Sequence, residues 1–76
     1  MNTPRLRRVL RKPEVLAASG YRPTQLDLLI EQGRFPRPIR LSEGGRALGW
    51  YEDEVVAFQQ ARIAERDREA AKRKKT

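Results

Sequence analysis

The chain has 76 residues, no cysteine, no histidine and a formal net charge of +7. A chain of this length forms one small domain with a modest core, and without disulfides it favours a reducing, intracellular compartment. The two missing residue types exclude thiolate and imidazole metal ligands and Ser-His or Cys-His nucleophiles, so we expect no catalytic, cofactor or metal site. Neither a membrane span of roughly 20 apolar residues nor the apolar segment of a signal peptide is found. We therefore predict a soluble, cytoplasmic protein.

Basic residues gather at the two ends. Residues 1–12 carry five basic side chains and no acid, and residues 62–76 carry seven basic and three acidic ones. The middle, residues 13–61, has five arginines against seven acids. Basic ends on a nearly neutral centre are typical of proteins that hold a polyanion, most often nucleic-acid phosphate; the alternative is that both ends are merely solvated. We expect a basic arm over residues 1–8, a domain over residues 9–62 and a basic helical tail over residues 63–76.

The stretch from Pro13 to Gly33 predicts two short helices joined by a tight turn. Proline suits a first helical turn, so the helices should begin near Pro13 and near Arg22-Pro23. Gly20 and Gly33 should end them, because glycine readily adopts the left-handed conformation at a helix C-terminus. The second helix has one apolar face, formed by Leu26, Leu29 and Ile30. This pattern indicates a helix-turn-helix, whose second helix usually enters the DNA major groove; a plain helical hairpin is the alternative.

The other side of the second helix carries the candidate contacts to bases. Thr24 and Gln25 can hydrogen-bond base edges, and Leu28 offers an apolar contact such as one to a thymine methyl. Asp27 and Glu31 oppose this role, since acids that face phosphate are repulsive unless an arginine neutralises them.

A two-stranded wing should follow. Pro36 and Pro38 force an extended segment, and residues 39–41 alternate apolar and polar as a strand does. A turn over residues 42–46, with a Gly-Gly pair free to adopt positive φ, leads to a returning strand over residues 47–50. The edge and tip of the wing carry three candidate contacts to phosphate or the minor groove: Arg37, Arg40 and Arg46. The alternative is that these arginines keep an exposed sheet edge soluble.

The remaining elements are a lead-in and a final helix. Val9-Leu10 is either a short strand or an irregular lead-in. The final helix should begin near Tyr51-Glu52, and its acids at residues 52–54 favour the positive end of the helix dipole rather than a metal site. Its basic end, Lys72, Arg73, Lys74 and Lys75, should add affinity for phosphate without specificity. The predicted core consists of Val15, Leu26, Leu29, Ile30, Phe35, Trp50, Val55 and Phe58.

Several motifs in this order carry a resemblance that covers about residues 6–62. They are Leu10-x-x-Pro13-Glu14-Val15, Ser19-Gly20, Leu29-Ile30-x-x-Gly33-x-Phe35-Pro36-x-Pro38, the Arg46 to Trp50 segment and Glu54-Val55-x-x-Phe58. With them the chain resembles the AlpA family of small phage and mobile-element regulators, which have an excisionase-like winged helix related to MerR-type DNA-binding domains.

The resemblance implies a mainly helical winged helix-turn-helix with a small β-hairpin and no catalytic activity. It further implies a sequence-specific DNA-binding protein, acting as a transcriptional regulator or as an excisionase (recombination directionality factor). Its partners would be double-stranded DNA and either a recombinase (integrase) or copies of the chain along DNA, with no membrane and no small-molecule substrate. The implied location is the bacterial cytoplasm, on the nucleoid when bound to DNA.

The chain departs from this family in the second helix. The family's helix usually opens with a serine cap and an arginine and carries a tyrosine and a second arginine on its outer face, where this chain has Arg22, Pro23, Asp27 and Leu28. DNA contacts should therefore shift to Arg22, the wing arginines and the basic ends. The alternative is a winged-helix protein–protein interaction module that uses Leu28 between two acids.

Overall fold

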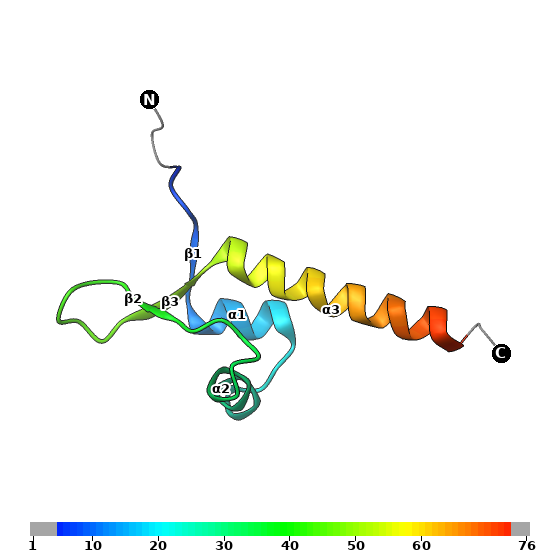
Figure 1. The fold of residues 1–76 in the computed structure, drawn as a ribbon. Helices are drawn as coiled ribbons and strands as arrows, with labels where there is room; N and C mark the ends of the chain where they lie inside the picture. The colour runs from blue at the N-terminus through cyan, green and yellow to red at the C-terminus, as the bar shows by residue number, and fades with distance from the viewer. Residues whose placement is uncertain (1–4, 74–76) are drawn as a thin grey trace.

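A computed structural model of the chain describes residues 5–73 and contains three helices and three short strands within them. In chain order these are β1 (Val9–Leu10), α1 (Lys12–Ser19), α2 (Pro23–Glu31), β2 (Ile39–Arg40), β3 (Leu48–Tyr51) and α3 (Glu52–Arg73). Figure 1 shows α1 and α2 below the first turns of α3, with the loop between β2 and β3 on the opposite side from the end of α3. This arrangement confirms the predicted fold class, a mainly helical winged helix-turn-helix.

Both short helices end as the glycines predict. Gly20 has φ +79° and its N–H donates to the Leu16 carbonyl at 2.9 Å, which closes α1. Gly33 has φ +73°, and the following N–H, that of Arg34, donates to the Leu29 carbonyl at 2.8 Å. At the start of α1, the Glu14 carboxylate accepts a 3.0 Å hydrogen bond from the Arg11 backbone N–H. The ends of both short helices therefore follow the local sequence signals.

The sheet has one strand more than the predicted hairpin. Its order is β1-β3-β2, both pairs antiparallel, with Leu10 opposite Trp50 on one side and Ile39 opposite Gly49 on the other. Val9-Leu10 is thus a strand and not an irregular lead-in. A side chain at position 49 would crowd this pairing, because a Cβ there would lie 2.5 Å from the Val9 side chain and 3.1 Å from the Leu10 carbonyl oxygen. In the turn of the wing only Gly44 has positive φ, so the expectation for the Gly-Gly pair holds at one of its two residues.

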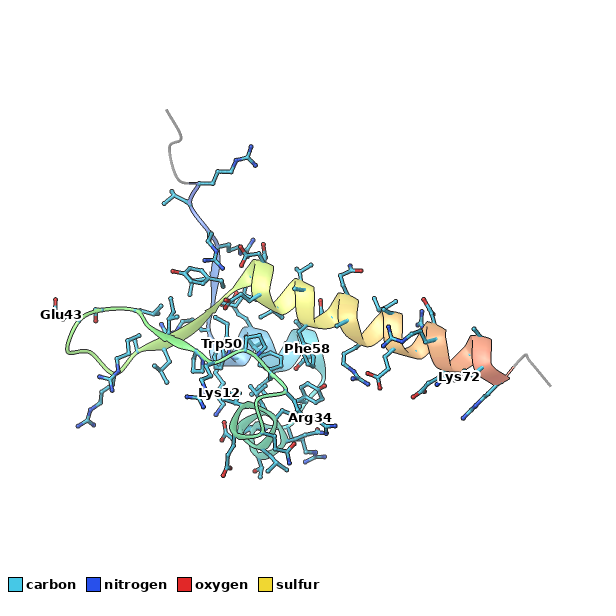
Figure 2. All side chains as sticks on the ribbon, viewed as in Figure 1. Lys12, Arg34, Glu43, Trp50, Phe58 and Lys72 are labelled. Carbon is cyan, nitrogen blue, oxygen red and sulfur yellow. The ribbon has the colours of Figure 1, made fainter. Side chains whose placement is uncertain are left out.

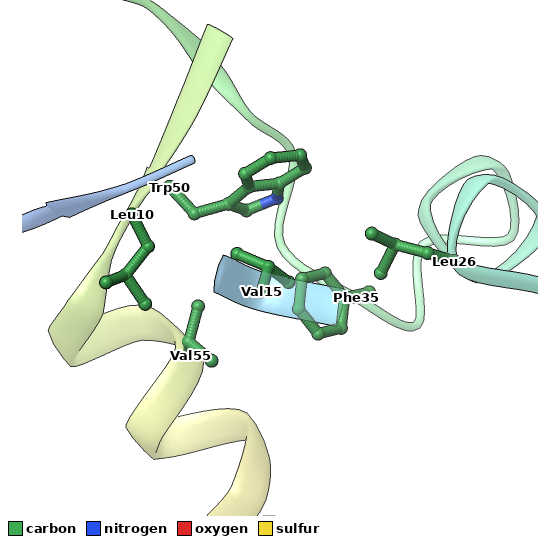
Figure 3. Close-up of a cluster of buried hydrophobic side chains, with 6 residues drawn as sticks. All are labelled: Leu10, Val15, Leu26, Phe35, Trp50 and Val55. Carbon is green, nitrogen blue, oxygen red and sulfur yellow. The ribbon is translucent and has the colours of Figure 1, made fainter. Parts of the chain in front are cut away.

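The core lies where the sheet meets the three helices (Figure 3). Its buried side chains are Leu10, Val15, Leu26, Phe35, Trp50 and Val55. Five of the eight predicted core residues are in this set, and the other three, Leu29, Ile30 and Phe58, are half-buried and pack against it. Trp50 is 3% exposed, and its indole N–H donates to the Pro36 carbonyl at 2.8 Å. This bond fastens the extended segment after α2 to the sheet.

The final helix extends well beyond the core. Val55 is buried and Phe58 half-buried, but from residue 66 to residue 73 every side chain is exposed. The molecule is consequently elongated, with extents of 55 × 40 × 20 Å. Across residues 5–73, no helix combines the length and the apolar character needed to cross a membrane.

Candidate nucleic-acid interface

The outward side of α2 is open along its length. Thr24, Gln25 and Leu28 are exposed, Leu28 to 50%, whereas Leu26 on the opposite side is fully buried. Arg22, the residue before the helix, is also exposed, and its side chain makes no capping hydrogen bond. The predicted contact residues of the second helix therefore share one accessible surface.

The wing presents positive charge beside this surface. Arg37, Arg40 and Arg46 are exposed, and within residues 5–73 none of the three forms an ion pair. Sequence reasoning overlooked one acid here: Glu43 is exposed in the turn and lies at the far end of the wing in Figure 2. The charge at the end of the wing is thus mixed, and the uniformly positive part lies on its strands and base.

Arg7 and Arg8, before β1, are used differently. The Arg7 guanidinium makes two 2.8 Å hydrogen bonds to the Asp53 carboxylate and stacks over the Tyr51 ring, with Cζ 3.7 Å from the ring centroid. Arg8 Nε lies 3.6 Å from the Glu52 carboxylate. Two charges assigned by sequence to a phosphate-binding arm are therefore matched by acids at the start of α3. Residues 1–4 lie outside the described residues.

These contacts also give the acids of α3 a second role. Sequence reasoning assigned residues 52–54 to the helix dipole only, although an acidic first turn next to an arginine-rich lead-in is itself a signal of pairing. The hydrogen bond from Arg7 holds the pKa of Asp53 below its ordinary value, and the same bond raises the pKa of Arg7. Among residues 5–73 no group of three acidic side chains is arranged to hold a metal ion.

Asp27, which sequence reasoning counted against DNA binding, has a basic neighbour. Lys12 Nζ lies 3.1 Å from its carboxylate, so a lysine of α1 neutralises it and not an arginine. Both side chains line an open cleft of about 380 Å³ between α1, α2 and the wing, together with Arg46 and Trp50. Repulsion between Asp27 and phosphate is consequently weaker than the sequence predicts.

At the C-terminal end of α3, Lys72 and Arg73 are exposed. They lie at the end of the helix that projects away from the core, as the position of Lys72 in Figure 2 shows. Lys74 and Lys75, the other two predicted phosphate contacts, lie outside the described residues.

Comparison with known proteins gives a family. The model of a family described as "Prophage CP4-57 regulatory protein (AlpA)" matches residues 8–63, which is well over half of the chain. Searches among curated proteins and among solved structures give no significant match. The matched stretch contains α1, α2, the sheet and the first turns of α3.

Proposed function

The chain belongs to the AlpA family of prophage regulatory proteins, and we propose that it is a sequence-specific DNA-binding regulator of a phage or mobile element. The observation that carries the proposal is the contrast in how its arginines are used. Arg7 and Arg8, before β1, are paired with acids, whereas the arginines of the wing and at the start of α2 are exposed and, within residues 5–73, without an ion-pair partner. This arrangement suits double-stranded DNA, because unpaired guanidinium groups can bind phosphates while the exposed helix contacts bases in a groove.

In this proposal the start of α2 enters a major groove, since the N-terminal residues of a recognition helix usually lie deepest in it. Arg22, Thr24 and Gln25 contact base edges there, and Leu28 contacts an apolar group such as a thymine methyl. The wing places Arg37, Arg40 and Arg46 against phosphates or the adjacent minor groove. Residues 72–75 add contacts to phosphate.

The biological role that we propose is regulation of transcription, or direction of excision through bent DNA at an attachment site. A recombinase or further copies of the chain on the same DNA would then be its protein partners. Such a protein acts in the bacterial cytoplasm, has no catalytic activity and needs no cofactor.

The decisive experiment is a footprint on the DNA that flanks the gene, followed by binding measurements on the protected site. We expect Arg46→Ala to weaken binding to specific and random DNA alike, by about tenfold, through loss of one charge-assisted contact to phosphate. Arg7→Ala removes the same formal charge where Asp53 already neutralises it and is the matched control. Equal effects of the two variants would contradict the assignment of Arg46.

Specificity is tested at Gln25. Gln25→Ala should cost about 1–3 kcal/mol on the cognate site and relax the preference at one base position. On random DNA the same variant should bind almost as well as the original chain. A uniform loss on all sequences would place Gln25 against the backbone and not against a base.

A second candidate is a protein–protein interaction module, favoured by one observation: Leu28 is half exposed between Asp27 and Glu31. Asp27→Asn distinguishes the two functions, because it also releases Lys12 from its ion pair. A DNA-binding protein should gain affinity for DNA at low salt. If Asp27→Asn and Leu28→Ala leave DNA binding unchanged and abolish binding to a protein partner, the second function is correct.

A further inference from the structure

A polar hollow flanks α2 on the side that faces α3. It has a volume of about 230 Å³ and is lined by Tyr21, Gln25, Leu29, Arg34, Phe58, Arg62 and Glu65. The cleft next to the wing is bordered instead by Asp27 and Ile30, from the other flank of the same helix. Lys12 and Arg34 mark these two flanks in Figure 2. The helix proposed to enter the major groove is thus bordered by charged side chains on both sides.

Aromatic packing fixes the floor of this hollow. The Tyr21 ring lies 6.5 Å from Phe35 and 6.3 Å from Phe58 between ring centroids, in edge-to-face arrangements. Tyr21 is therefore half-buried and held in place, on the hollow that Gln25 also lines. A phenol is a donor that proteins use toward phosphate oxygens.

Two arginines supply positive charge at the edge. Arg34 follows Gly33 at the end of α2, is exposed, and has no ion-pair partner in residues 5–73. Arg62 comes from α3, one turn beyond Phe58, and its Nη1 lies 2.8 Å from the Glu65 carboxylate. The hollow thus carries two guanidinium groups against one carboxylate, which is a net positive charge.

We infer that this hollow binds one phosphate of the DNA backbone, at the edge of the major groove that α2 enters. The inference rests on the proposed function and adds Arg34, Arg62 and Tyr21 to the contact surface. Guanidinium groups bind phosphate through paired N–H···O bonds, which fix orientation as well as add affinity. A phosphate held here sets the register of α2 in the groove and directs the basic second half of α3 along the same backbone.

Arg34→Ala tests the inference. It leaves the backbone N–H of residue 34 bonded to Leu29, so the end of α2 is retained, and circular dichroism confirms folding. We expect affinity to fall about tenfold on every DNA sequence and the salt slope to become shallower by about one. Arg8→Ala, which removes the same charge from a site paired with Glu52, should have a much smaller effect.

Glu65→Gln tests it in the opposite direction. Releasing Arg62 from its ion pair should strengthen DNA binding several-fold, whereas Glu52→Gln, which releases Arg8 in the same way, should not. Ethylation interference should identify one phosphate at the groove edge. Ethylation of this phosphate should weaken DNA binding by the original chain but not by Arg34→Ala.

The outcomes separate this inference from the proposed function. If the original chain binds no DNA, the proposed function fails and the hollow has no phosphate to hold. If the chain binds DNA but Arg34→Ala equals Arg8→Ala, or Glu65→Gln equals Glu52→Gln, only the hollow is refuted.

Discussion

The two halves of α3 are both helical, but only the first half packs against the rest of the chain. The first half buries Val55 in the core, packs Phe58 against Phe35 at 4.7 Å between ring centroids, and pairs its acids with Arg7 and Arg8. The second half has only exposed side chains from residue 66 to residue 73. Tertiary packing stabilises the first half, whereas the second depends on helix propensity and local ion pairs such as Arg62 to Glu65.

Helix formation and core formation therefore have separate causes in this chain. A solvated helix of this length is marginal by itself, so its second half must be extended from turns that the core already holds. The acids of α3 are divided between the two halves. Three of them, residues 52–54, lie in the first turn next to the arginines of the lead-in, whereas Glu65, Asp67 and Glu69 alternate with the basic residues further along the helix.

The largest effect should come from removing an anchor of the first half. Phe58→Ala should destabilise the fold by about 3 kcal/mol, because it leaves a cavity beside Tyr21 and Phe35. Ile63→Ala is the matched control in the second half, where the side chain is 42% exposed. It should change stability by less than about 0.5 kcal/mol. Urea denaturation measures the free energy of unfolding of both variants. Similar decreases would show that the second half of α3 also has tertiary packing contacts.

Deletion of residues 72–76 tests the second half of α3. It removes four positive charges, those of Lys72, Arg73, Lys74 and Lys75, and no core residue. The free energy of unfolding should hardly change, but DNA binding should weaken on every sequence alike and the salt slope should fall by at most about 4. Very different losses on specific and random DNA would show that the tail contributes specificity.

How much of this could be predicted from sequence depended on the range of each interaction. The turn at Gly20, the end of α2 at Gly33 and the acidic start of α3 are local, because proline, glycine and capping residues act within a few positions. The boundaries of α1 and α2 followed from them. The aromatic core followed from apolar spacing, together with the Trp50 that returns from the wing.

What sequence reasoning missed depends on contacts between distant segments. Two residues, Val9 and Leu10, are too few to show a strand pattern, so the third strand became visible only through its pairing with β3. The same holds for Arg7 with Asp53, for Lys12 with Asp27 and for the hollow that Arg34 shares with Arg62. Charge counts along the chain cannot show which arginines are paired with acids and which are exposed without a partner, since that depends on the fold.

The smallest effect that we predict concerns the contact between the lead-in and the first half of α3. Arg7 and Asp53 are both substantially exposed, so their pair contributes little and is screened by salt. The hydrogen bond from Arg7 nevertheless holds the pKa of Asp53 below its ordinary value of 3.8 in the folded chain. The unfolded chain therefore binds a proton at Asp53 at higher pH than the folded chain does.

It follows that the contribution of this pair to stability is fully present above about pH 4 and is lost as the pH falls through the lowered pKa. We expect the melting temperature of the original chain to exceed that of Asp53→Asn near neutral pH, and the difference to shrink as the pH falls below the ordinary carboxylate pKa of 3.8. Asp67→Asn, which removes a carboxylate bonded to its neighbour Arg66 within the exposed half of α3, is the control for loss of one acid. A difference between the original chain and Asp53→Asn that stays constant with pH would mean that Arg7 is held by the Tyr51 ring alone, because stacking on an aromatic face does not titrate with the carboxylate.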